Sequence, residues 1–434
     1  MEDKIVLFWF RRDLRLHDNH GLFQALTSGL PVLPVFIFDT EILEKLNSKT
    51  DARVSFIHAE TKKIKTELEK NESTLKTFHS TSLDAFKKLV ETHDVVAVYS
   101  NRDYEPAALE RDKKIKTFLK DKGIEFLQFK DQVVFEENEV QKDDETPYTV
   151  FTPYSKKWKK TLKDHPISEY ESENELDKLL KVSSSSFPKL KELGFEESDA
   201  EIPSRNFPEE VIRNYAKTRD FPAEEEGTTR LGIHLRFGTV SIRRLVQKAA
   251  ELSDVFLNEL IWREFYMSVL WHFPQVVEKA FKPKYDFINW RKNEEEFERW
   301  CKGETGYPMV DAGMRQLNAT GFMHNRLRMV TASFLTKHLL IDWRWGEAYF
   351  AEKLLDYELA SNNGGWQWAA GSGCDAAPYF RIFNPENQQK KFDPKDKYVM
   401  KWVPEMGMKR YPEPIVEHKE ARERALRIYK EAVK

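Results

Sequence analysis

The sequence predicts an α/β domain with a parallel sheet, then a long linker, then an all-α domain. Three observations support this prediction. The chain has 434 residues, more than a single core normally holds. Short apolar runs alternate with amphipathic stretches over the first ~130 residues, whereas apolar residues recur at helical spacing in the second half. The expected boundaries are 1–132, 133–208 and 209–434.

The N-terminal domain is predicted to be Rossmann-like, with Leu83–Thr92 as one of the amphipathic helices between its strands. The predicted strands are IVLFWF (5–10), VLPVFIF (32–38), VVAVYS (95–100) and IEFLQF (124–129). The first strand leads into RRDLRLHDN, and no GxGxxG motif opens the next helix, so the usual dinucleotide-phosphate loop is missing. A dinucleotide is therefore expected elsewhere in the chain.

The middle of the chain, from about Val134 to Pro208, is polar, rich in charge and interrupted by a run of serines at 183–186. This composition predicts a connector over the surface. Helices are predicted after it at Leu231–Ala250, Phe256–Phe273, Met309–Leu317, Leu327–Leu340 and Glu347–Ala360. Since no strand-like alternation interrupts them, the second domain should be all-α.

Charge and tryptophan content both direct attention to the second half. The net charge is −3, but residues 1–200 carry −6 and residues 201–434 carry +3. If nucleic acid binds, a local basic patch on the second half must attract the phosphates. Nine of the eleven tryptophans lie between Trp262 and Trp402, more than packing normally requires.

Several classes of protein are disfavoured. No apolar run approaches the ~18 residues of a membrane helix, and MEDKIVLFWF lacks the features of a signal peptide, so a cytoplasmic protein without a membrane partner is expected. The two cysteines, Cys301 and Cys374, have neither CxxC nor histidine spacing. Neither a disulfide framework nor a zinc site is indicated, and no metal is expected.

The most informative tract is NNGGWQWAAGSGCDAAPYFRIFNP, from Asn362 to Pro385. It combines tryptophans, a tyrosine and phenylalanines with several glycines, one arginine and a carboxylate. Glycines let the backbone approach a flat ring closely, and Trp366 and Trp368 can offer their faces to an aromatic partner. The tract therefore predicts a site for a planar cofactor or a nucleobase, with a glycine-rich core loop as the alternative.

Together these motifs closely resemble the photolyase/cryptochrome family. The resemblance runs from FWFRRDLRLHDN (8–19) through ELIWREFY (259–266) to IVEHKEARERAL near the end. Among its members, the chain looks most like a class I cyclobutane pyrimidine dimer photolyase. The resemblance implies a monomer that carries reduced FAD in the all-α domain, binds damaged DNA and lies at the nucleoid when bound.

For the FAD phosphates, the resemblance implies contacts from the stretch that begins the helix at Leu231, where free N–H groups and hydroxyls can hold a pyrophosphate. The residues are Tyr215, Thr228, Thr229, Arg230, Leu231 and Gly232. Many relatives have serine where this chain has Gly232, which leaves one side-chain contact open. Ordinary helix capping by the threonines is the alternative.

For the flavin ring, Arg328 and Asp356 match an ion pair of the family, and Asp356, Tyr357 and Glu358 match contacts to the ring. A salt bridge between helices is the alternative for Glu358, where many relatives have aspartate. Asn362 matches the residue that faces flavin N5. An amide can hydrogen-bond there without supplying a proton, so it favours the fully reduced flavin, whereas plant cryptochromes have an aspartate.

For the substrate, the resemblance implies a pocket that receives two linked pyrimidines flipped from the duplex. Its residues are Glu259, Trp262, Arg263, Tyr266, Asn325, Met329 and Trp368, and Arg219, Arg326, Arg381 and Gln388 would contact DNA or the rim. We hypothesise that burial keeps Glu259 protonated, so that it donates to the pyrimidine as negative charge builds up. Asn325 follows His324 where (6-4) photolyases have a histidine pair, which favours the cyclobutane lesion. Without the family, WREFY would be an aromatic helix face in a core.

The resemblance also implies electron transfer and an antenna. Trp290, Trp343 and Trp366 match the tryptophan triad that reduces photoexcited flavin, with core packing as the alternative for each. Glu105 matches a carboxylate that holds a folate antenna in some relatives. A second antenna contact falls in a gap near Glu278–Lys284, so methenyltetrahydrofolate, a deazaflavin, a second flavin or nothing could bind.

The predicted function is light-driven repair of cyclobutane pyrimidine dimers by electron transfer from excited reduced FAD. The alternatives are a cryptochrome-type photoreceptor and a (6-4) photolyase. A flavin dehydrogenase is disfavoured because no nicotinamide site is recognisable.

Overall fold

The computed structural model describes residues 4–434, which form two compact units. The first unit contains the described residues up to Glu139, together with Lys160–Arg205 and Leu231–Lys248. The second unit contains Val140–Lys159, Asn206–Arg230 and Ala249–Lys434.

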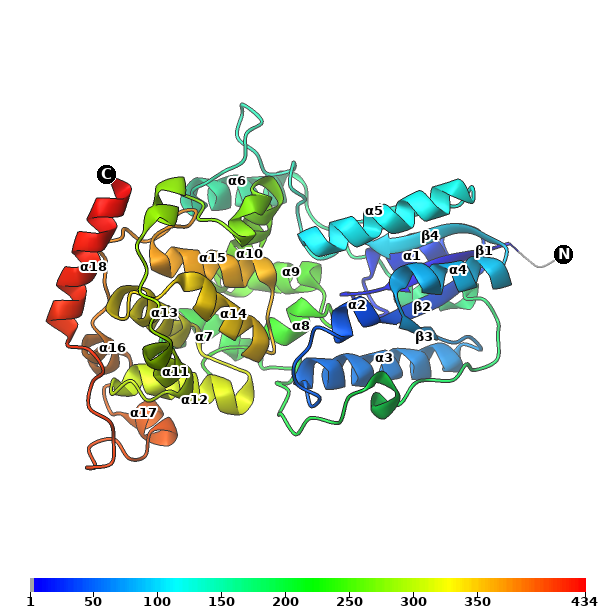
Figure 1. The fold of residues 1–434 in the computed structure, drawn as a ribbon. Helices are drawn as coiled ribbons and strands as arrows, with labels where there is room; N and C mark the ends of the chain where they lie inside the picture. Colours follow the sequence, from blue (N-terminus) through cyan, green and yellow to red (C-terminus); the bar gives the residue numbers. More distant parts are fainter. Residues whose placement is uncertain (1–3) are drawn as a thin grey trace. The chain divides into compact units, whose positions relative to one another are not determined.

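The first unit is built on a parallel sheet, as predicted (Figure 1). Within residues 4–434 the sheet has five strands in the order β3-β2-β1-β4-β5. Their bounds are Ile5–Phe10 (β1), Val32–Asp39 (β2), Lys76–Ser80 (β3), Val95–Asn101 (β4) and Glu125–Phe129 (β5). The central β1 is buried along its whole length, which explains its continuous apolar run. β3 was missed because KTFHS is polar and remains partly exposed at the edge of the sheet.

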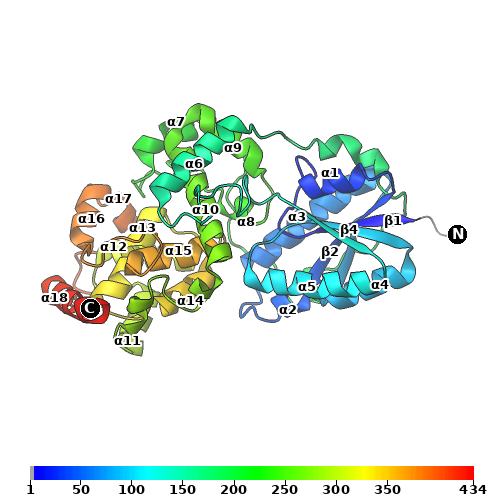
Figure 2. The same cartoon turned by 90° about the horizontal axis from the view of Figure 1, so that it is seen from above.

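Helices cover both faces of this sheet. Figure 2 shows α1 and α3 on one side and α4 and α5 on the other. The helices of this unit are α1 (His20–Leu26), α2 (Thr40–Leu43), α3 (Ala52–Lys70), α4 (Ser82–Thr92), α5 (Pro106–Asp121), η1 (Ser172–Lys178), η2 (Leu190–Leu193), α8 (Gly232–Arg236) and most of α9 (Ile242–Leu252). Leu7, Val35 and Phe86 belong to its apolar core. The predicted helix Leu83–Thr92 is α4.

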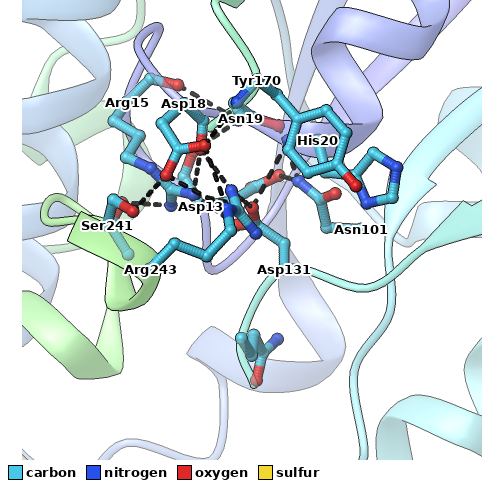
Figure 3. A network of polar contacts seen from close by, with 12 residues as sticks. Asp13, Arg15, Asp18, Asn19, His20, Asn101, Asp131, Tyr170, Ser241 and Arg243 are labelled. Carbon is cyan, nitrogen blue, oxygen red and sulfur yellow. Dashed lines mark hydrogen bonds and ion pairs between the residues drawn. The ribbon is translucent and has the colours of Figure 1, made fainter. Parts of the chain in front are cut away.

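A buried polar network explains why α8 and most of α9 belong to this unit, although both were expected in the C-terminal domain (Figure 3). The Arg243 guanidinium lies 3.0 Å from Asp18 and 2.8 Å from Asp131. Arg15 lies 2.7 Å from the same Asp131. Because breaking a buried ion pair leaves an uncompensated charge, these contacts hold the segment around Arg243 firmly on the α/β unit.

The segment 133–208, predicted to be a linker, does not form a separate connector, because its residues are divided between the two units. It contains α6 (Phe151–Asp164), whose Tyr154 and Trp158 are buried. The Trp158 indole N–H donates to Glu264 over 2.6 Å. The lysines on the solvent side of α6 made the segment look like a surface connector, although its other face is apolar.

The second unit contains no strand within the described residues, in agreement with the predicted all-α fold. Besides most of α6, its helices are α7 (Glu209–Thr218), α10 (Asp254–His272), η3 (Pro274–Val277), η4 (Pro283–Phe287), α11 (Glu294–Lys302), α12 (Pro308–Thr320), α13 (Asn325–Ser333), η5 (Phe334–His338), α14 (Trp343–Lys353), α15 (Leu359–Ala370), α16 (Pro385–Phe392), α17 (Lys397–Trp402) and α18 (His418–Val433).

Some predicted helices are interrupted. Leu231–Ala250 breaks between α8 and α9, where Gly238 has φ +63° and an added Cβ would overlap the Arg12 backbone. Leu327–Leu340 becomes α13 followed by the π-turn η5. Glu347–Ala360 is two helices, α14 and α15, separated by Leu354–Glu358.

Among the residues that the structure describes, no helix combines the length and apolar character needed to cross a membrane. The same part of the chain shows no cluster of histidine, cysteine, aspartate or glutamate suited to a metal ion.

Candidate functional site

A cavity of about 430 Å³ lies in the second unit, a size typical of sites for small organic molecules. Its walls come mainly from α10, α13, α15 and the segment between α14 and α15. The lining residues are Arg219, Glu259, Trp262, Arg263, Tyr266, Asn325, Arg328, Met329, Ala332, Phe350, Leu354, Asp356, Tyr357, Glu358, Ser361, Asn362, Gly365, Trp366 and Trp368. Most side chains predicted to contact the flavin ring or the substrate therefore meet in one cavity.

Helical spacing brings these side chains together. On α10, Glu259, Trp262, Arg263 and Tyr266 follow the i, i+3, i+4, i+7 pattern that places residues on one helix face. Apolar side chains on the rest of α10 are buried in the core. Asn325, Arg328, Met329 and Ala332 repeat the same pattern on α13.

On α15, adjacent glycines have different surroundings. A Cβ added to Gly364 would overlap the Tyr266 ring, so this glycine allows α10 and α15 to approach closely. Gly365 lines the cavity, and a Cβ added to it would meet nothing within 4 Å. Gly365 therefore leaves the backbone of α15 open to a flat guest.

Arginine–carboxylate pairs surround the cavity. Arg328 lies 2.9 Å from Asp356, which is the ion pair that the family resemblance implies, and both side chains are partly exposed. Arg263 lies 3.0 Å from Glu358, and the Ser361 hydroxyl donates to the other Glu358 oxygen. The alternative considered for Glu358, a salt bridge to a neighbouring helix, is thus present.

Glu259 is paired with Arg219, whose guanidinium also lies over the Tyr215 ring. Burial raises the pKa of Glu259 above its ordinary value, and the positive charge of Arg219 opposes that rise. Two opposing effects therefore act on the carboxyl group that we expected to be protonated.

Asn362 has a partner that sequence reasoning missed. Its side-chain N–H groups donate to the Glu347 carboxylate over 2.8 Å and to the Glu347 backbone carbonyl over 3.1 Å. Glu347 lies on α14 and is absent from the cavity lining. No motif pairs these positions, because the contact depends on how α14 packs on α15.

The three predicted triad tryptophans lie in different environments. Trp366 is buried and lines the cavity, Trp343 is fully buried at the start of α14, and Trp290 is half-buried against Tyr429 at a ring distance of 5.8 Å. Trp366 also meets Trp300 edge-on at 6.0 Å, a neighbour that the sequence comparison did not suggest.

The predicted phosphate contacts stand apart from the cavity lining. None of Tyr215, Thr228, Thr229, Arg230, Leu231 and Gly232 belongs to it. The alternative of helix capping by the threonines is wrong, and the helix begins later than expected: α8 starts at Gly232, its N-cap is Leu231, and no side chain caps it. The threonines precede the helix because Arg230 adopts a left-handed conformation with φ +51° and lies over Phe322.

The side chains predicted to contact DNA differ in whether they already have a partner within the protein. Arg326 lies 2.6 Å from Asp220 and stacks over Phe392, so it already has partners within the protein. Arg381 is exposed, and no ion pair to it is found within residues 4–434. Gln388 is half-buried on α16.

Glu105, the predicted antenna contact, lies in the first unit at the start of α5. It forms ion pairs with Arg12, over 2.9 Å, and with Arg236. A chromophore that used this carboxylate would have to share it with two guanidinium groups.

Comparison with known proteins gives consistent matches to both parts of the chain. Residues 6–172 match the family model described as DNA photolyase, and residues 256–409 match the FAD binding domain of DNA photolyase. The chain is 37% identical to the deoxyribodipyrimidine photo-lyase of Vibrio cholerae over 98% of this chain and 99% of the relative.

Solved structures agree with the fold. A bacterial class III photolyase from Agrobacterium tumefaciens has a TM-score of 0.85 at 33% identity and is matched over 100% of this chain and 98% of its own. An archaeal photolyase from Sulfolobus tokodaii, solved with two FAD molecules, has a TM-score of 0.84 at 35% identity, over 98% and 99% of the two chains.

Proposed function

Because the chain belongs to the photolyase/cryptochrome family, we propose that it is a light-driven enzyme that repairs cyclobutane pyrimidine dimers in the cavity of its second unit. The composition of this cavity carries the proposal. It combines a side suited to a flavin ring, around Asn362 and Gly365, with a side suited to paired pyrimidines, around Glu259 and Trp262. A deoxyribodipyrimidine photo-lyase requires both sides in one place.

The flavin side fits FAD by its shape and its donors. Open space at Gly365 leaves room for a flat ring against α15, and the Arg328–Asp356 pair offers charged groups to the ring edge. When bound, reduced FAD supplies the light absorption and the electron that repair requires. Thr228, Thr229 and Arg230, which precede α8, are the proposed phosphate contacts.

The substrate side fits two flipped bases. Photolyases extrude their target from the base stack, so the pocket must replace stacking and hydrogen bonds. Trp262 and Trp368 provide aromatic surface, while Glu259 and Asn325 can bind the polar pyrimidine edges. Arg381 is available to a phosphate, whereas Arg219 and Arg326 would have to exchange carboxylates for phosphates.

The position of His324 favours the cyclobutane lesion over the (6-4) photoproduct. Its Nδ1 accepts the Arg326 backbone N–H and caps α13, and burial lowers its pKa to about 4. His324 is therefore buried and neutral, and it does not line the cavity, so it is poorly suited to act as an acid on a substrate there in the way a histidine of the (6-4) pair could. A photoreceptor role stays the second candidate, since Asn362 and FAD would serve either function.

A substrate panel tests the proposal. Photoreduced protein is mixed with oligonucleotides that contain a cyclobutane dimer, a (6-4) photoproduct or no lesion, and thymine recovery is measured in light and in darkness. We expect light-dependent recovery from the cyclobutane dimer alone. Recovery from the (6-4) substrate would replace the proposed specificity, and no recovery by flavin-loaded protein would favour the photoreceptor.

Size-exclusion chromatography tests the predicted monomer.

A further inference from the structure

Phe151 lies directly against Trp262, a wall of the cavity. The two rings are stacked with centroids 3.8 Å apart and planes 5° apart. Phe151 itself is not part of the cavity lining. One face of the Trp262 indole is therefore covered by Phe151, and only the other face and the ring edges are available to a guest.

Contacts from separate segments hold Phe151 in this place. Its backbone N–H donates to the Asp375 carboxylate over 3.0 Å, which ties the start of α6 to the loop after α15. Farther along α6, the Trp158 indole donates to the buried Glu264 on α10. Since Glu264 and Trp262 lie on the same helix, α6 is fixed to the helix whose aromatic side chain it supports.

The edges of Trp262 are supported as well. Phe265 meets it edge-on, with centroids 5.6 Å apart and planes at 80°, and Tyr266 lies at 5.4 Å. These neighbours restrict sliding of the indole, whereas the parallel Phe151 ring restricts its tilt. Without Phe151, space on the covered face would let the indole turn away from the cavity.

We infer that Phe151 is a positioning residue for damage recognition: it fixes the plane of Trp262 so that the open indole face can stack on the extruded pyrimidines. This inference rests on the proposed function. Undamaged DNA that stays stacked does not reach Trp262, so Phe151 should affect the affinity for dimer-containing DNA and leave the affinity for undamaged DNA unchanged.

A double-mutant cycle tests this role. Dissociation constants for dimer-containing and undamaged oligonucleotides are measured at one salt concentration for wild type, Phe151→Ala, Trp262→Ala and the double variant. An aromatic pair is worth enough that Phe151→Ala should lower the preference for the dimer about threefold to tenfold. In the Trp262→Ala background, Phe151→Ala should have no further effect, because it acts through Trp262.

Matched variants separate positioning from folding. Phe151→Tyr keeps the stacked ring and should retain the wild-type preference. Phe129→Ala removes a half-buried phenylalanine that stacks on Tyr99 in the first unit, and it should leave the preference unchanged. Melting temperature and FAD content are recorded for every variant, so that a general loss of structure is recognised.

The outcomes are distinct. If wild type prefers dimer-containing DNA and Phe151→Ala keeps the full preference, the inference is wrong and the proposed function stands. An equal loss in the wild-type and Trp262→Ala backgrounds also contradicts it. If wild type itself shows no preference for the dimer, the proposed function fails, and the role of Phe151 in damage recognition fails with it.

Discussion

The side-chain amide of Asn362 donates to the carboxylate of Glu347 over 2.8 Å. The same amide nitrogen donates to the Glu347 backbone carbonyl over 3.1 Å, and a carbonyl oxygen only accepts, so this contact fixes which end of the amide faces Glu347. The Asn362 oxygen is then left for the cavity that Asn362 lines. The cavity receives an acceptor at this place, which can bind an N–H group of a reduced flavin but cannot protonate the ring.

The first prediction concerns this orientation. Glu347→Gln replaces an acceptor by a side chain that can pair with either end of the Asn362 amide. Only the Glu347 backbone carbonyl then still holds the amide nitrogen, so the acceptor at the cavity is enforced less strongly. The reduced flavin should lose about 1 kcal/mol of stabilisation, which lowers its two-electron midpoint potential by about 20 mV. Spectroelectrochemistry of the flavin-loaded variant measures this shift. Glu352→Gln on the same helix is the control, and an equal potential in wild type and Glu347→Gln would refute the orienting role.

The second prediction uses the adjacent glycines of α15. Gly365→Ala meets open space, and alanine favours a helix interior over glycine by roughly 0.5–1 kcal/mol, so the flavin-free protein should become slightly more stable. FAD binding should weaken, because the new methyl group occupies the side facing the cavity. Gly364→Ala should instead destabilise the protein, since its Cβ overlaps Tyr266. Thermal unfolding and flavin titration of both variants check this contrast. Undiminished FAD affinity in Gly365→Ala would place the flavin elsewhere.

The third prediction concerns Asp13 in the network of Figure 3. Burial raises the pKa of Asp13 to about 6. Because the folded protein then holds this proton more tightly than the unfolded chain does, the contribution of Asp13 to stability is full below pH 3.8 and is lost as the pH rises through about 6. This change amounts to about 3 kcal/mol.

Asp13→Asn removes this titration. The difference in unfolding free energy between wild type and variant should therefore move in favour of the variant as the pH rises from about 4 to about 6. Urea denaturation at several pH values measures it, with the exposed Asp121→Asn as the control. A difference that stays constant over this range would mean that Asp13 is ionised throughout.

The fourth prediction separates electron supply from repair. Trp366→Phe should block photoreduction of oxidised flavin, because phenylalanine is much harder to oxidise than tryptophan. Repair by chemically reduced protein should stay nearly intact. Absorbance during illumination and a repair assay on the same samples test both statements, with Trp345→Phe as the control. Equal loss of both activities would mean that Trp366 acts mainly through packing or substrate contact.

Much of the site could be predicted because its residues lie on regular helix faces. Glu259, Trp262, Arg263 and Tyr266 lie within two turns of α10, so a sequence match also places them in space. Phe151 and Glu347 were missed because they reach the cavity residues from other helices. Nothing in local sequence marks such contacts, which form only when α6 packs on α10 and α14 packs on α15.

In the fold, too, features marked in the local sequence could be predicted, whereas features that depend on tertiary contacts could not. β1 was recognisable from its buried apolar run, whereas the polar edge strand β3 was not. The break between α14 and α15 contains neither glycine nor proline, and its cause is tertiary. The Leu355 N–H donates to the Gly321 carbonyl, and Asp356 pairs with Arg328. These contacts outweigh the helical propensity of the segment.

The fifth prediction compares binding with repair. Arg381→Ala should weaken DNA binding most at low salt and flatten its salt dependence, because an exposed cation binds phosphate. The yield of repaired thymine per absorbed photon from fully bound DNA should stay unchanged. Glu259→Ala should lower this repair yield more than it weakens DNA binding. A donor to developing negative charge acts after the substrate has bound, and losing one costs enzymes up to about 2.7–4 kcal/mol.

The most direct measurement is the single-turnover yield of thymine per absorbed photon, with photoreduced protein in excess over a dimer-containing oligonucleotide. Wild type should restore thymine in light and not in darkness, and Glu259→Ala should give a clearly lower yield from fully bound substrate. A flavin-loaded wild type that restores no thymine in light, or a Glu259→Ala complex that repairs at the wild-type yield, would contradict the claim that this cavity is the site of repair.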